Sequence, residues 1–147
     1  MSKSMSSPLF LDVNLWVALT FDRHAHHVKA KEWYEAVPAT ATLVFCRQTQ
    51  LGLFRILTTA AVMHQNVLTQ RECWQVFDQW IATGQVAWAD EPGETETRLR
   101  GLTQGASASP KVWMDAYLTA FADGANLTLV TFDKALAEKA KGAVLLA

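Results

Sequence analysis

Five short apolar runs, separated by longer stretches with helical patterning, constrain the fold of this chain more than any other feature. Each run is too short for a helix and is bounded by polar or turn-forming residues, as buried parallel strands are. The alternation predicts right-handed crossovers and a central parallel sheet with helices on both faces. The fold class is therefore predicted to be α/β, with four to five short strands. The runs are Leu9–Val13, Thr42–Cys46, Gln85–Trp88, Leu127–Thr131 and Val144–Leu146.

About seven helices are predicted between and beside these strands. Asn14 is expected to cap the first of them. Thr69 and Glu72 have the spacing of a capping box. Ser109 followed by Pro110 suits the start of a helix, with serine as the cap and proline at the first position. The predicted helices are Asn14–Leu19, His26–Val37, Gln48–Thr59, Thr69–Ala82, Glu94–Thr103, Pro110–Gly124 and Asp133–Lys141.

The size and composition of the chain are those of one globular domain. Half of its 147 residues are hydrophobic and 18% are charged, which permits a sizeable core and argues against disorder. We predict a single domain over residues 1–147, with 1–7 as a flexible N-terminus. No membrane span or secretory signal is found, so a cytoplasmic location without membrane contact is expected. Cys46 and Cys73 lie in separate apolar stretches and are expected to be reduced core residues.

The charge balance limits how the protein can bind a polyanion. Its formal net charge is −1, so no global basic field is present. A nucleic acid would have to be held by a local basic rim and by metal ions.

Three aspartates are placed where a parallel sheet binds ligands. Asp12 ends the first predicted strand, and Asp133 follows the fourth. Asp115 is one turn into the helix that leads to the fourth strand. If the first and fourth strands are neighbours, all three reach the crevice at the carboxyl ends of the strands. Carboxylate oxygens suit Mg²⁺ or Mn²⁺.

Each aspartate also has a structural interpretation. Asp133 is well placed to cap the following helix, and Asp12 suits a turn or a cap ahead of the first helix. Asp115 lies among apolar side chains, where a carboxylate is costly unless a metal ion or an arginine pairs with it. Together the three positions favour a site.

At these residues the chain resembles the PIN-domain ribonucleases, and within them the VapC-type toxins of bacterial toxin–antitoxin pairs. The resemblance implies a PIN fold and a divalent-metal endoribonuclease that cleaves RNA phosphodiester bonds with metal-activated water. It also implies a homodimer and a small VapB-like antitoxin partner. Asp12, Asp115 and Asp133 carry over as the catalytic metal ligands. The motifs, in order over nearly the whole chain, are Leu11–Trp16, His26–Trp33, Thr49–Arg55, Asp115–Ala120 and Val130–Asp133.

One position departs from the family pattern. Gln50 stands where many relatives have an acid, which removes a negative charge, so one tightly bound ion is expected and a second is uncertain. Asn14, Gln50 and Thr131 are secondary candidates for metal or water contacts, although a buried structural hydrogen bond explains Gln50 equally well. Arg47 and Arg55 flank the site helix and are candidates for RNA phosphates.

Two other functions compete with the nuclease. A phosphatase would use Asp12 as its nucleophile, but Asn14 stands where such enzymes usually carry a second acid. A catalytically weak or silent PIN-like RNA- or protein-binding module would have Gln50 as its first sign of decay. Uptake of Mn²⁺ separates an active site from a silent one.

Overall fold

The computed structural model describes residues 7–147, and its centre is a five-stranded parallel sheet. The strand order is β3-β2-β1-β4-β5, so β1 lies between β2 and β4. Phe10 of β1 is opposite Val44 of β2 and Leu129 of β4. The predicted α/β class and the pairing of the first and fourth strands are confirmed. The strands are β1 (Leu9–Leu11), β2 (Leu43–Phe45), β3 (Val86–Trp88), β4 (Thr128–Thr131) and β5 (Val144–Leu145).

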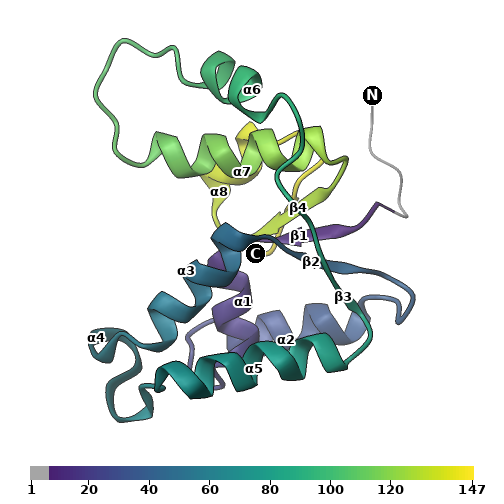
Figure 1. Ribbon diagram of the computed structural model, residues 1–147, viewed down its shortest axis with the longest axis vertical. Coiled ribbons are helices and arrows are strands. Elements are labelled where there is room, and N and C mark those ends of the chain that lie inside the picture. Colours follow the sequence, from purple (N-terminus) through teal and green to yellow (C-terminus); the bar gives the residue numbers. More distant parts are fainter. Residues whose placement is uncertain (1–6) are drawn as a thin grey trace.

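Helices cover both faces of the sheet, with α1, α2, α3 and α5 on one face and α6, α7 and α8 on the other (Figure 1). The described residues contain eight α-helices, one more than the sequence predicts; the addition is the four-residue α4. The helices are α1 (Val13–Thr20), α2 (His27–Ala36), α3 (Arg47–Leu57), α4 (Ala60–Met63), α5 (Gln70–Ala82), α6 (Thr95–Leu102), α7 (Val112–Gly124) and α8 (Lys134–Lys139), with a short 3-10 turn η1 (His64–Asn66).

Two predicted helix starts are wrong and one is confirmed. Asn14 does not cap α1: it lies inside the helix, because the main-chain carbonyl of Asp12 already accepts the first helical hydrogen bonds. α7 begins two residues later than Pro110, because residues 109–111 form a turn closed by a bond from the Val112 N–H to the Ser109 carbonyl. The capping box at the start of α5 is present as predicted.

The core has two parts because successive strand side chains point to opposite faces of a sheet. In β1, Leu11 belongs to the cluster under α1, α2, α3 and α5, and Phe10 belongs to the cluster under α7 and α8. Cys46 and Cys73 are buried free thiols, as predicted. Within residues 7–147 no helix combines the length and the apolar character that crossing a membrane requires. The predicted flexible segment over residues 1–7 falls, except for Ser7, outside the described residues.

Candidate active site

Asp12 leaves the sheet at the carboxyl end of β1. Its N–H donates to the Val130 carbonyl of β4 at 3.0 Å, which extends the pairing of the two strands to the first residue beyond β1. Asp12 occupies the N-cap position of α1 without a side-chain capping bond. The carboxylate is therefore not used to start the helix, and it is directed to the edge where β1 and β4 both end.

Asp133 reaches the same edge from β4. Its Oδ1 accepts a hydrogen bond from the Leu136 N–H at 3.2 Å and caps α8, so the structural interpretation of Asp133 is confirmed. The Thr131 hydroxyl joins the two strand ends. It donates to Asp12 Oδ2 at 2.8 Å and accepts from the Asp133 N–H at 2.9 Å. Thr131, a secondary candidate from sequence, thus fixes both residues from a fully buried position.

Asp115 approaches from the first turn of α7, with 16% of its side chain exposed. Its Oδ2 lies 4.0 Å from Lys139 Nζ at the end of α8. The protein cation beside Asp115 is thus a lysine and not the arginine that the sequence suggested, and a metal partner for Asp115 stays a prediction. Lys139 had no sequence signal because its contact with Asp115 depends on the packing of α7 against α8.

The neighbouring carboxylates change the pKa of Asp12 and of Asp115. Burial raises the pKa of Asp12, and the charges of Asp133 and Asp115 raise it further, against the hydrogen bond from Thr131. Burial and the Asp133 charge raise the pKa of Asp115, while Lys139 and Lys111 lower it. The three aspartates therefore face one region, at the point where the sheet's connections turn from one side of β1 to the other.

These carboxylates are neighbours without forming a closed ligand shell. Among residues 7–147, no three histidine, cysteine or acidic side chains are gathered tightly enough to hold one metal ion. The Asp133 carboxylate caps α8, and the Asp115 carboxylate faces Lys139. Three hard oxygen donors that repel one another nevertheless have the chemistry that Mg²⁺ or Mn²⁺ requires. Their assignment as metal ligands stays a prediction.

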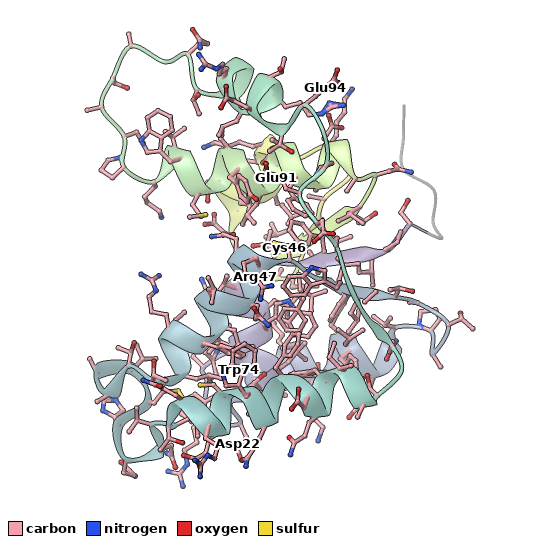
Figure 2. The ribbon with its side chains drawn as sticks, in the orientation of Figure 1. Asp22, Cys46, Arg47, Trp74, Glu91 and Glu94 are labelled. Carbon is pink, nitrogen blue, oxygen red and sulfur yellow. The ribbon has the colours of Figure 1, made fainter. Side chains whose placement is uncertain are left out.

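Gln50 is 2% exposed and part of a chain of contacts at the start of α3. Its Oε1 accepts a hydrogen bond from Arg47 Nη1 at 2.6 Å, as its structural interpretation predicted. The Arg47 guanidinium also lies 4.5 Å from the centre of the Trp88 ring. Arg47 sits at the middle of the molecule beside Cys46 (Figure 2), engaged by protein groups on two sides. Its phosphate-binding role stays a prediction.

The other two candidates point to solvent. Asn14 is exposed on α1. Arg55 is exposed on α3, and its guanidinium has no ion pair or hydrogen bond to the residues that the structure describes. The side chains of both residues are therefore accessible to RNA or water.

Gly52 sets the position of α3 relative to the site. A Cβ at this glycine would lie 2.7 Å from Val13 Cγ2, closer than packed carbon atoms can approach. Val13 directly follows Asp12 in the chain. Only a residue without a side chain therefore lets α3 pack this closely against the start of α1, beside the carboxylate edge.

Comparison with known proteins agrees with this architecture. The family model described as PIN domain matches residues 9–142. Ribonuclease VapC41 of Mycobacterium tuberculosis is 37% identical over 134 residues, which cover 88% of this chain and 92% of that protein. Ribonuclease VapC39 of the same species is 30% identical over 132 residues, covering 88% and 91%.

The crystal structure of M. tuberculosis VapC20, a sarcin-ricin loop cleaving toxin, matches with a TM-score of 0.64 and 15% sequence identity, covering 88% of this chain and 93% of that one. This likeness bears on the fold, and the two sequence relatives extend over nearly the whole chain. The chain belongs to the PIN domain family and, within it, to the VapC proteins.

Proposed function

We propose that this protein is a divalent-metal-dependent endoribonuclease and the toxin of a VapBC-type toxin–antitoxin pair. The observation that carries the proposal is the meeting of Asp12, Asp115 and Asp133 at one edge of the sheet, where the Asp133 charge raises the pKa of both Asp12 and Asp115. The relatives over most of the chain are named ribonucleases, which supports RNA as the substrate. A partly buried acidic cluster would repel RNA unless a cation binds with it.

In the proposed reaction, Asp12, Asp115 and Asp133 would hold one Mg²⁺ or Mn²⁺ ion. When bound, such an ion supplies Lewis-acid activation of water and of the phosphodiester. Thr131 keeps the Asp12 carboxylate oriented through its hydroxyl, and so acts as a positioning residue. Lys139 offsets part of the negative charge at Asp115.

The test is cleavage of single-stranded RNA by purified protein with Mg²⁺ or Mn²⁺. Asp115→Asn is expected to lower the rate by at least about 100-fold, because it removes one of the three carboxylates that would hold the metal ion. The matched control is Asp22→Asn. Asp22 is exposed and is separated from Asp12 by the whole of α1, roughly 12 Å of helix, and it lies at the lower end of the view in Figure 2. Equal cleavage by the Asp115 variant and the wild type would remove Asp115 from the mechanism.

A catalytically silent binding module is the second candidate. It is favoured by Gln50, which brings no charge to the site and is already bonded to Arg47. Such a protein would bind RNA without cutting it in the same assay.

A homodimer, a VapB-like antitoxin and a cytoplasmic location complete the proposal. Exposed apolar side chains on α7 and α6 give a dimer or an antitoxin apolar area to cover; they are Trp113, Met114 and Leu102. Light scattering on the purified protein, alone and with the product of an adjacent small gene, would measure both associations.

A further inference from the structure

A pocket of about 410 Å³ opens between α6, α7 and α8, beside the carboxylate edge. Its walls combine apolar atoms with cationic side chains. Leu102 and Ala140 supply apolar surface, and Arg98, Lys139 and Lys141 supply positive charge. The residues around it are Arg98, Gly101, Leu102, Thr119, Ala120, Asp123, Lys139, Ala140 and Lys141.

The cations of this pocket are incompletely neutralised. Arg98 Nη1 lies 3.4 Å from Asp123 Oδ2, the single carboxylate among the lining residues. The Arg98 Nε is buried and, among residues 7–147, has no hydrogen-bond partner. Lys141 forms no ion pair with the described part of the chain. The pocket is thus a local positive region on a chain whose net charge is −1.

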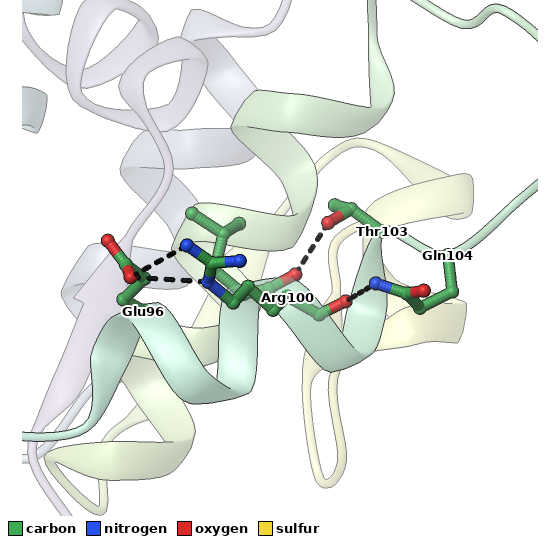
Figure 3. A network of polar contacts seen from close by, with 5 residues as sticks. Glu96, Arg100, Thr103 and Gln104 are labelled. Carbon is green, nitrogen blue, oxygen red and sulfur yellow. Dashed lines mark hydrogen bonds and ion pairs between the residues drawn. The ribbon is translucent and has the colours of Figure 1, made fainter.

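The neighbouring cation of α6 does not contribute to this charge. Arg100 pairs with Glu96 at 3.2 Å along the helix. Figure 3 shows this pair together with the bonds that close the end of α6, in which Thr103 and Gln104 donate to main-chain carbonyls. Of the two arginines of α6, Arg98 is therefore the one that contributes positive charge to the pocket.

The pocket adjoins the proposed active site through one residue, Lys139. Lys139 lines it and also lies 4.0 Å from Asp115 Oδ2. Thr119 and Asp123 lie four and eight residues after Asp115 in α7, which places them roughly 6 and 12 Å farther along the helix axis. A chain that places one phosphate at the carboxylates would reach the pocket with an adjacent nucleotide.

We propose that this pocket binds the nucleotide next to the cleaved bond of a single-stranded RNA. Lys141 and Arg98 contact its phosphate, and the apolar wall at Leu102 and Ala140 receives the sugar or base. Phosphates bind lysine and arginine, and ring faces pack on apolar or planar side chains in single-strand-binding proteins. The proposal rests on the ribonuclease function above and assigns its phosphate contacts to α6 and α8 in addition to the arginines of α3.

The test compares Lys141→Gln with Lys29→Gln, both made in the non-cleaving Asp115→Asn background. Lys29 is an exposed lysine of α2, on the opposite face of the sheet. Affinity for a fluorescent single-stranded RNA is measured over a series of salt concentrations. Loss of one phosphate contact is expected to weaken binding several-fold and to reduce the slope of log K against log salt by about 0.7. The Lys29 variant should match its parent.

An unchanged RNA affinity and salt slope for Lys141→Gln would overturn the proposal that the pocket binds RNA. If the same variant also loses binding to an oligoglutamate peptide, the pocket is assigned to an acidic polypeptide. Cleavage by the wild-type protein is measured separately with Mg²⁺. If the wild type cleaves RNA and the Lys141 variant binds RNA as its parent does, only the role of the pocket is refuted. If the wild type does not cleave RNA, the proposed function is refuted.

Discussion

The two faces of the sheet are built differently. Under α1, α2, α3 and α5, large aromatic rings interlock: Trp16 stacks on Phe45 with ring centres 3.8 Å apart, and Trp80 meets Trp16 edge-on at 5.2 Å. Under α7 and α8 the aromatic contacts are fewer: Phe121 packs on Phe10 at 4.9 Å and meets Tyr117 edge-on at 6.0 Å, among smaller side chains. That second face carries Asp115, Lys139 and the cationic pocket.

This contrast separates stability from chemistry. The aromatic core packs against α1, which begins directly after Asp12, and against α3, which begins at Arg47, three residues before Gln50. The face under α7 and α8 supplies Asp115 and the cationic pocket. Both faces leave large apolar side chains exposed, among them Trp74 of α5 and Trp113 of α7. A precisely arranged site needs rigid support. Substitutions in the aromatic face should therefore lower the free energy of unfolding more than substitutions elsewhere.

The largest effect is expected for Trp16→Ala. Trp16 is fully buried, and its removal should lower the free energy of unfolding by about 3–5 kcal/mol. Trp113→Ala is the matched change on the other face, where the ring is 60% exposed, and should alter stability by no more than about 0.5 kcal/mol. Denaturant unfolding measures both, and similar losses from the two variants would contradict the contrast.

A second pair uses glycines. Gly52→Ala should destabilise the fold by about 1–3 kcal/mol, because its Cβ would collide with Val13 on the aromatic face. Gly101→Ala on α6 meets nothing within 4 Å and should stabilise the helix by up to about 1 kcal/mol. Thermal unfolding measures both changes: the unfolding temperature should fall for Gly52→Ala and rise for Gly101→Ala. A Gly52→Ala variant with unchanged stability and normal activity would show that the close approach of α3 to α1 is not needed.

The third prediction concerns the link between the strand ends. Thr131→Val removes the hydroxyl that bonds Asp12 and Asp133, and should reduce Mn²⁺ affinity and RNA cleavage by roughly 10–100-fold. Thr131→Ser keeps the hydroxyl and should restore most of the loss. A purely structural role for Thr131 would lower the unfolding temperature without a matching change in metal affinity.

The smallest effect is on the stability of the metal-free protein. Burial, with help from its acidic neighbours, raises the folded-state pKa of Asp12 above its ordinary value of 3.8. The folded state therefore binds this proton more tightly than the unfolded state, and stability from Asp12 is lost as pH rises through the folded pKa. Asp12→Asn should stabilise the fold by about 1 kcal/mol at pH 7, with the gain vanishing toward pH 3.8. Unfolding in EDTA across this pH range measures the difference, and an Asp12→Asn variant less stable than the wild type at pH 7 would contradict it.

The strand ends could be predicted from sequence because each carries its own local signal. A short apolar run followed by aspartate marks both Asp12 and Asp133, and the parallel sheet brings adjacent strand ends together. Capping was predictable where the residue types formed a complete motif, as at Thr69 with Glu72. It failed at Asn14, because a residue with good capping chemistry is not the cap when the chain has already entered the helix.

The contacts that depend on packing between distant helices could not be predicted. Lys139 meets Asp115 only through the pairing of α7 with α8. The pocket requires α6 to lie beside both, although Arg98 and Lys141 are far apart in the chain. The hydrogen bond from Arg47 to Gln50 is local in sequence. The contact of the Arg47 guanidinium with the Trp88 ring, however, exists only because β3 pairs with β2.

The most direct measurement is a calorimetric titration of the metal-free protein with Mn²⁺. If Asp12, Asp115 and Asp133 form one metal site, the wild type should take up one ion tightly, and Asp115→Asn should bind it at least about 10-fold more weakly. Asp78→Asn, which alters an exposed acid of α5, should behave as the wild type. Identical Mn²⁺ uptake by the Asp115 variant and the wild type would contradict the account.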